Sequence, residues 1–296
     1  MQNKRLLLSM VMAIAVNAFV SAQPSPVTVK KSTTRHGPEK GSLIIIGGGG
    51  TTPEIWKKFV ELAGGIEKAN VVVVTTATGD SAATSFGSIN SLKKATGIQH
   101  VTLLHTGDLS TANSEQFVEP IRKATAVFFD GGRQWRPADS YLNTLAHQAF
   151  LDLLDRGGVI AGSSAGATIQ GSFLWRGDTQ GPDILVGDHT QGLGFLKNSA
   201  IDQHLLARNR QFALVDFIRQ TPELIGIGLD QSTAILVQKD TLEVIGKSYV
   251  AIYDYKTITT SPHPFFFLHQ GQRYDLANRQ IIGLKPASNA GSDDDE

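Results

Sequence analysis

The chain of 296 residues contains no cysteine. This absence excludes disulfide bridges, a thiol nucleophile, thiolate metal ligands and a lipoprotein attachment site. A net charge is lacking too, because 27 Lys and Arg residues balance 27 Asp and Glu residues. A neutral chain offers little attraction to nucleic acid or to an anionic membrane surface, so we expect neither as a partner. Hydrophobic residues make up 41% of the sequence, which suits a globular enzyme with a substantial core.

The N-terminus has the pattern of a signal peptide over residues 1–22. A positively charged start precedes an apolar run from Leu6 to Val20, and small residues follow as far as Ala22. A membrane anchor is the alternative, but the run is shorter than the ~20 residues needed to span a bilayer, and Asn17 interrupts it. We therefore expect cleavage after Ala22 and export of the protein to the periplasm or the medium, without a remaining membrane attachment.

The rest of the chain predicts a single α/β domain over residues 41–287, between a flexible segment 23–40 and an acidic, disordered tail 288–296. Short apolar runs without polar alternation indicate strands covered on both faces, and helical spacing over 52–63 and 137–154 separates them. This alternation is typical of a doubly wound, mostly parallel sheet with flanking helices. The strand-like runs are 43–46, 71–74, 101–104, 126–129 and 159–160.

After Ala167 the pattern changes to short strands separated by turns, at 183–186, 234–237, 242–245 and 249–255. No linker precedes them, so we expect an antiparallel, C-terminal extension of the same domain. Ligands of a doubly wound sheet bind at the carboxyl ends of its parallel strands. A glycine-rich turn, 47–50, follows the first strand, but its spacing differs from the dinucleotide-binding fingerprint.

The segment 159–167 has the form of a nucleophile elbow, in which a buried strand turns sharply into a helix with Ser164 at the apex. Small residues on both sides let the strand and helix approach closely. A flexible loop or a phosphate-binding turn is the alternative. If strands 126–129 and 159–160 are neighbours, the backbone N–H groups of Gly132 and Ala165 can form an oxyanion hole.

A serine nucleophile needs a base, and His204 is the best candidate among the eight histidines, with His189 as a competitor. His204 lies in an apolar stretch that leads into a cluster of directional polar groups. Arginines in such a cluster can clamp carboxylates, although they can also pair with Asp216 or Glu223 on a helix surface. The cluster consists of Asp202, Gln203, Arg208 and Arg210.

Together these motifs resemble the cyanophycinases, in consistent order from about Ser42 to Lys285. The motifs are 130–134, 162–167, 192–196, 202–204 with the two arginines, and 226–234. Cyanophycinases are serine peptidases related to aspartyl dipeptidase, with a fold like that of class I glutamine amidotransferases. The resemblance implies exo-type hydrolysis of cyanophycin, a polyaspartate with arginine on each side-chain carboxyl, to β-Asp-Arg dipeptides. It also implies a homodimer. Acyl transfer on a serine requires neither cofactor nor metal, and none of the histidines shows the short spacing of a zinc motif.

Carried over by position, the resemblance makes Ser164 the nucleophile and His204 the base. Gln134, Asp202, Gln203, Arg208 and Arg210 are then expected to hold substrate, the arginines binding carboxylates and Asp202 with the amides binding guanidinium groups. The chain departs from the family at two positions. Ala213 stands where a third arginine is common, and Arg133 stands where an asparagine is common. We hypothesise that Arg133 supplies the missing charge from the opposite side of the cleft.

The acid behind the histidine is expected from the segment between Ser164 and His204. We predict Asp178, with Asp183 next, while Gln180 occupies a place where some members have a carboxylate. A dipeptidase for aspartyl or isoaspartyl dipeptides is the nearest alternative function, and a binding module without turnover is another. A glutamine amidotransferase is excluded, since that chemistry normally uses a cysteine.

Overall fold

The computed structural model describes residues 36–79 and 87–283, all of which belong to one compact unit. The predicted signal peptide, the acidic tail and most of the predicted flexible segment 23–40 lie outside the described residues. The end of that segment is packed, which corrects the expectation of flexibility there. His36 is buried and its backbone N–H donates to Asp240 Oδ1 over 2.8 Å. Among the described helices, none combines the length and apolar character required to cross a membrane.

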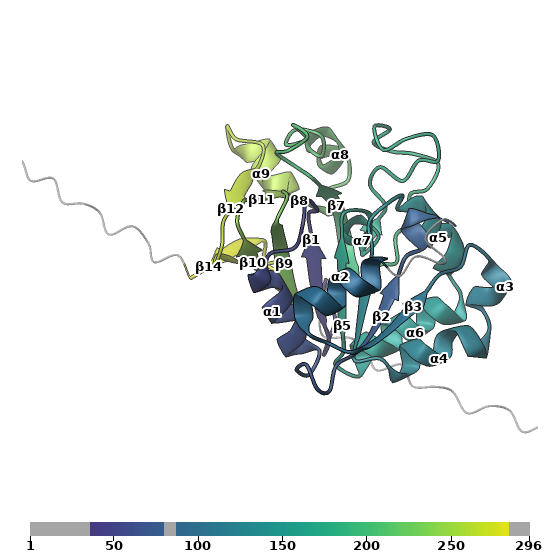
Figure 1. Cartoon of the computed structure of the whole chain (residues 1–296). Coiled ribbons are helices and arrows are strands. Elements are labelled where there is room, and N and C mark those ends of the chain that lie inside the picture. Colours follow the sequence, from purple (N-terminus) through teal and green to yellow (C-terminus); the bar gives the residue numbers. More distant parts are fainter. Residues whose placement is uncertain (1–35, 80–86, 284–296) are drawn as a thin grey trace, which may run out of the picture. The chain divides into compact units, whose positions relative to one another are not determined.

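The fold centres on a nine-stranded sheet with the order β14-β13-β10-β9-β1-β5-β4-β2-β3 (Figure 1). Its parallel part confirms the predicted doubly wound arrangement, and β4 and β5 are neighbours as the oxyanion hole requires. The parallel strands are β1 (Ser42–Ile46), β2 (Asn70–Val74), β3 (His100–Leu104), β4 (Ala126–Phe129) and β5 (Val159–Ser163). The antiparallel extension consists of β9 (Thr233–Gln238), β10 (Thr241–Gly246), β13 (Arg273–Asp275) and β14 (Gln280–Ile282).

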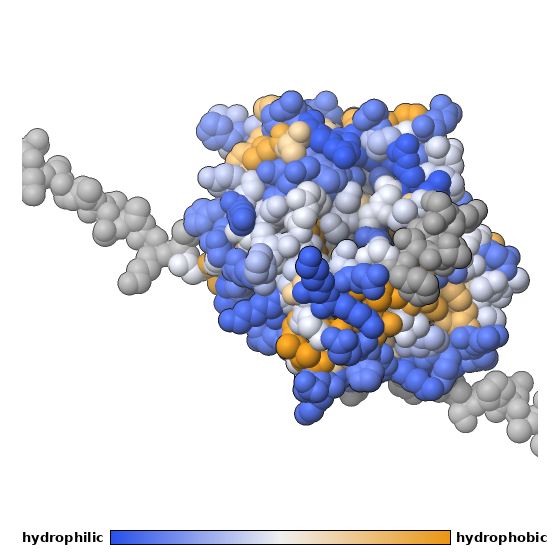
Figure 2. Space-filling model, viewed as in Figure 1, coloured by the Kyte–Doolittle hydropathy of each residue, from blue (hydrophilic) through white to orange (hydrophobic). Residues whose placement is uncertain are grey.

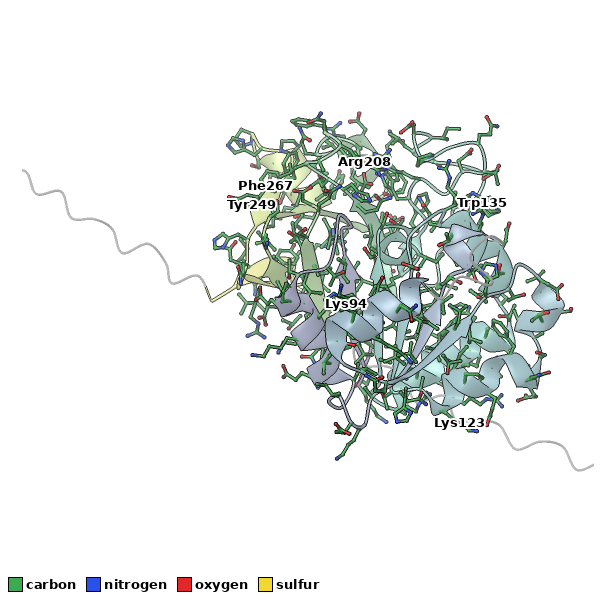
Figure 3. The ribbon with its side chains drawn as sticks, viewed as in Figure 1. Lys94, Lys123, Trp135, Arg208, Tyr249 and Phe267 are labelled. Atoms are coloured by element: carbon green, nitrogen blue, oxygen red, sulfur yellow. The ribbon has the colours of Figure 1, made fainter. Side chains whose placement is uncertain are left out.

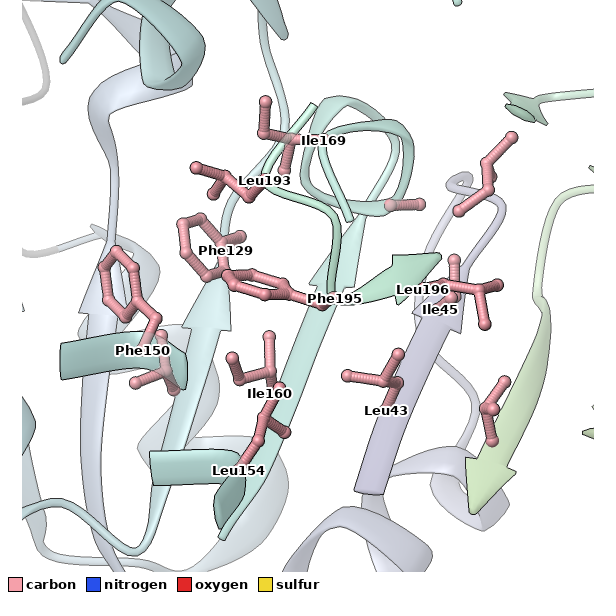
Figure 4. Packing of buried hydrophobic residues seen from close by; sticks show 14 of the residues in the cluster. Leu43, Ile45, Phe129, Phe150, Leu154, Ile160, Ile169, Leu193, Phe195 and Leu196 are labelled. Atoms are coloured by element: carbon pink, nitrogen blue, oxygen red, sulfur yellow. The ribbon is translucent and has the colours of Figure 1, made fainter. Parts of the chain in front are cut away.

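Apolar residues cover both faces of this sheet, because successive side chains of a strand point to opposite sides. Leu43 and Ile45 pack with the helices of one face, whereas Ile44 and Ile46 pack with α1 and α2 on the other. Figure 4 shows the first of these layers. The helices are α1 (Pro53–Leu62), α2 (Gly87–Thr96), α3 (Leu109–Ala112), α4 (Glu115–Lys123), α5 (Trp135–Tyr141), α6 (Leu145–Asp155), α7 (Ala165–Thr168), α8 (Val215–Gln220) and α9 (Tyr255–Thr260), with a 3₁₀ turn at Thr76–Thr78.

A second, five-stranded sheet was not expected from the sequence. It has the order β12-β11-β8-β7-β6 and shares a hydrophobic core with the first sheet. Its strands β6, β7 and β8 are parallel, and β11 and β12 are antiparallel. The bounds are β6 (Gly171–Phe173), β7 (Leu196–Gln203), β8 (Ile225–Leu229), β11 (Val250–Tyr253) and β12 (Phe266–Leu268).

Two expected elements differ in the structure. The helical pattern over 137–154 is two helices, α5 and α6, because Asn143 adopts a left-handed φ of 60° and Thr144 caps the second helix. The predicted strand 183–186 is an exposed turn, in which Ile184, Leu185 and Val186 remain in solvent contact. On the face shown in Figure 2, hydrophobic residues gather in patches bordered by hydrophilic ones.

Candidate active site

Ser164 occupies the turn between β5 and α7, at φ 56° and ψ −112°. This backbone conformation is rare for a residue with a side chain, and it lifts the serine above the carboxyl end of the sheet. The turn is tight because its glycines permit it. A Cβ on Gly162 would lie 2.1 Å from the Gly166 carbonyl oxygen, and one on Gly166 would lie 2.1 Å from the Phe129 carbonyl oxygen. The elbow geometry predicted from the sequence is thus present.

His204 follows β7 and brings its Nε2 atom to 2.9 Å from Ser164 Oγ. Its ring lies against the glycine-rich turn after β1, where a Cβ on Gly48 would come within 2.3 Å of His204 Cε1. The predicted competitor His189 instead bridges Asp188 and Asp139, each over 2.7 Å. The structure therefore joins Ser164 with His204 across the junction of the two sheets.

Gln231, just after β8, occupies the other side of the imidazole. Its Nε2 lies 2.9 Å from His204 Nδ1, and a 180° turn of the amide group places Oε1 there instead. The tautomer that accepts the serine proton at Nε2 carries hydrogen on Nδ1, and that hydrogen requires the amide oxygen of Gln231 as acceptor. A side-chain amide thus orients the ring where many serine hydrolases use a carboxylate, and it stabilises an imidazolium less than a carboxylate does.

The surroundings of His204 keep its imidazole neutral. Burial, together with the nearby Arg208 and Arg210 guanidinium groups, lowers the pKa of His204 from 6.5 to about 4, while Asp202 and Asp230 act in the opposite direction. At neutral pH the imidazole is therefore unprotonated and able to accept a proton from Ser164.

Asp178 does not lie behind the histidine, which corrects our sequence-based prediction. Its Oδ1 accepts the Gln180 N–H over 2.8 Å and its Oδ2 accepts the Asp188 N–H over 3.2 Å. The carboxylate thus organises the loop between β6 and β7. The second choice, Asp183, lies exposed on the same loop. The position at His204 Nδ1 is filled from β8, which lies after the histidine in the chain.

Two backbone N–H groups beside Ser164 have no hydrogen-bond partner in the described part of the chain, those of Gly132 and Ala165. Gly132 has a φ of 137°, and a Cβ there would lie 2.1 Å from the Ala77 carbonyl oxygen. Only glycine fits this turn. Free N–H groups next to a nucleophile are available to a developing oxyanion, and this geometry is compatible with the role predicted for both residues.

A cavity of about 430 Å³ opens in front of Ser164. Three arginines, Arg133, Arg136 and Arg208, line it, and no acidic residue of the described chain does so. Within the described residues, the side chains of Arg133 and Arg208 make no hydrogen bond or ion pair. Figure 3 places Arg208 above the carboxyl ends of the central strands. The cavity is therefore suited to an anionic group.

Asp202 lies beneath this cavity rather than in it, which corrects its predicted role in substrate binding. Its carboxylate is 0% exposed and pairs with Arg176, through contacts of 2.9 and 3.0 Å, and with Trp175 Nε1 over 3.1 Å. Arg210 Nη1 lies 3.5 Å from the same carboxylate and is buried as well. The guanidinium groups that Asp202 binds are those of this chain.

The two glutamines predicted to hold substrate, Gln203 and Gln134, line the cavity but also bind other groups of the chain. Gln203 lines the cavity, but its Oε1 accepts from Arg210 Nη1 over 3.3 Å. Gln134 also lines the cavity, while its Nε2 donates to the carbonyls of Trp175 and Arg176 over 3.0 and 2.7 Å. Of the five residues predicted to hold substrate, Arg208 is the exposed one.

Sequence reasoning missed Gln231, Gly48 and Arg176. The first two lie two residues after buried strands, β8 and β1, at the carboxyl edge where ligands bind, so the strand-end rule could have found them. Arg176 carried no such signal, because its partner Asp202 is 26 residues away in sequence.

Residues 43–245 match the sequence profile of Peptidase family S51. The chain is similar to a cyanophycinase of Synechococcus elongatus, with 28% identity over 78% of this chain and 73% of the relative. A cyanophycinase of Geminocystis herdmanii is 29% identical over 76% of this chain and 84% of the relative.

The fold is similar to that of a peptidase from an acI-B1 Actinobacterium. The two structures align with a TM-score of 0.61 and 23% identity, over 80% of this chain and 97% of the other. The match to the family covers more than half of the chain. The chain therefore belongs to peptidase family S51 and is a serine-type peptidase.

Proposed function

We propose that the chain is an exported exopeptidase that hydrolyses cyanophycin to β-Asp-Arg dipeptides through an acyl-enzyme on Ser164. The observation that carries the proposal is the Ser164–His204 contact of 2.9 Å at the head of an arginine-lined cavity. The family match and the relatives named cyanophycinase support the substrate class.

Catalysis would begin when His204 Nε2 takes the proton from Ser164 Oγ as that oxygen attacks the backbone carbonyl carbon of an aspartyl residue. The N–H groups of Gly132 and Ala165 stabilise the oxyanion. Collapse of the tetrahedral intermediate breaks the C–N bond, and His204 returns the proton to the departing amine. Water, deprotonated by His204, then attacks the ester and releases the product acid and the free serine.

The cavity chemistry fits this substrate. Each arginyl branch of cyanophycin carries a carboxylate as well as a guanidinium, and the polymer ends in a further carboxylate. Arg208 and Arg133 face the cavity without partners in the described chain, so they can bind these carboxylates. A substrate without carboxylates would leave both cations unpaired.

The test is digestion of insoluble cyanophycin by the purified protein, with product analysis and with Asp-X dipeptides in parallel. Ser164→Ala should retain the fold, seen in an unchanged circular dichroism spectrum, and lower turnover by about 10⁴-fold or more. Dipeptide release that persists in this variant would refute the role of Ser164. Cleavage of Asp-X dipeptides without attack on the polymer would favour the dipeptidase function instead.

Export is a separate part of the proposal and rests on the charged start and apolar run of residues 1–22. Expression of the full chain with fractionation tests it. A mature N-terminus at Gln23, found in the periplasm or the medium, is expected. An intact Met1 on protein retained inside the cell would contradict export.

A further inference from the structure

A second cavity, of about 390 Å³, adjoins the nucleophile elbow. Ser163, the residue before the nucleophile, lines it, and so does Asp130 at the end of β4. The two cavities are close neighbours. Gly131, next to Asp130, is near enough to Ser164 that a Cβ on it would lie 3.6 Å from Ser164 Cβ.

The second cavity has the opposite electrostatic character to the first. Asp130 is the only charged residue among its described lining residues, and the hydroxyl residues Ser88 and Ser91 lie around it. The carboxylate accepts the Gly131 N–H over 3.1 Å and the Ser88 hydroxyl. Its two oxygens offer about four acceptor sites, so two remain for a ligand.

An aromatic wall completes this cavity. The indole of Trp56 lines it and is only partly buried, held in place by Phe128 with ring centroids 5.3 Å apart. A planar cation can stack on such a ring while its N–H groups reach a carboxylate, and guanidinium does both better than an ammonium group. The cavity thus combines a carboxylate, hydroxyls and an indole within reach of the nucleophile.

We propose that this second cavity binds the guanidinium of a substrate arginyl branch and that Asp130 selects for it. The proposal rests on the proposed function and deepens it. The arginine-lined cavity takes carboxylates and the Asp130 cavity takes the cation, so the two flank the scissile bond with opposite charge. This also supplies a guanidinium acceptor in place of Asp202, whose carboxylate is already paired within the chain.

Selectivity for arginine over citrulline tests the proposal, because citrulline has nearly the same shape and no charge. Cleavage rates are compared for a synthetic cyanophycin segment and for its citrulline counterpart. Asp130→Asn preserves the shape and an acceptor for Gly131, and it should reduce the arginine-to-citrulline ratio of kcat/KM by about 10-fold or more. An equal loss on both substrates would show that Asp130 only supports the turn, and would overturn the proposal.

The matched control is Asp183→Asn, an exposed aspartate that does not line this cavity. It should leave the ratio unchanged. A drop in the ratio as large as that for Asp130→Asn would mean that overall negative charge, not this cavity, selects arginine.

Binding measured without turnover separates this proposal from the proposed function. Calorimetry of Ser164→Ala with Nα-acetylarginine amide should give a Kd at least about 10-fold lower than with the citrulline amide, and addition of Asp130→Asn should abolish the difference. If the wild type fails to cleave cyanophycin but this difference holds, the cavity assignment stands and the polymer substrate is wrong. If cyanophycin is cleaved and the difference is absent, the cavity assignment alone fails.

Discussion

Four arginines around the active site form two groups that differ in burial and in pairing. Arg176 and Arg210 are buried and lie against the Asp202 carboxylate. Arg133 and Arg208 line the cavity, and their guanidinium groups have no partner among the described residues. A buried charge must be paired to be tolerated, whereas a partly exposed one can remain free for a ligand. Burial and pairing therefore separate the groups that hold the structure from those available to substrate.

The largest expected effect comes from removing the buried carboxylate. Asp202→Ala leaves Arg176 and Arg210 buried without their anion, which should lower the free energy of unfolding by about 3–5 kcal/mol, measured by urea denaturation. The matched control is Asp216→Ala, because Asp216 also pairs with an arginine, Arg219, but is 80% exposed. That control should change stability by less than about 0.5 kcal/mol. Similar losses for both would erase the distinction between the two groups.

The next effect concerns substrate affinity. Arg208→Ala should leave stability unchanged and raise KM for cyanophycin by about 10-fold or more, since one charge-assisted hydrogen bond to a carboxylate is lost. Arg133→Ala tests whether that residue replaces the charge missing at Ala213, and unchanged activity would end this hypothesis. Arg219→Ala, outside the cavity, serves as the control and should leave KM unaltered.

The smallest effect is a change in pH dependence. Gln231→Glu places a carboxylate at His204 Nδ1 and should move the acid limb of kcat/KM upward from about pH 4 by about one pH unit. The value of kcat/KM falls at low pH because protonated His204 cannot act as a base. An unchanged limb would show that Gln231 does not contact the working imidazole.

Protonation of His204 also affects folding stability. The pKa of His204 is 6.5 ordinarily and about 4 in the folded protein, so between these values the unfolded chain binds more protons. Folding stability should therefore decrease as the pH falls from 6.5 towards 4, and Gln231→Glu should weaken this dependence.

The sequence was sufficient for the features that local chemistry determines. The parallel strands, the elbow at Ser164 and the choice of His204 followed from apolar runs, small residues and the polar cluster after an apolar stretch. The partner of His204 could not be found in this way, because Gln231 reaches the imidazole only once β7 and β8 pair. Asp202 was assigned to substrate because residue type alone does not reveal burial. The turn 183–186 was taken for a strand because a run of three apolar residues usually indicates burial. In the structure these three residues remain exposed.

The position of the two sheets relative to each other has a consequence for folding. Ser164 extends from the nine-stranded sheet, whereas His204 and Gln231 extend from the five-stranded one. Neither sheet alone contains a nucleophile together with its base. Peptidase activity thus arises only when the two sheets have docked through their shared core. A chain in which the two sheets have not docked lacks the Ser164–His204 contact, so activity regained during refolding reports this docking rather than the formation of either sheet.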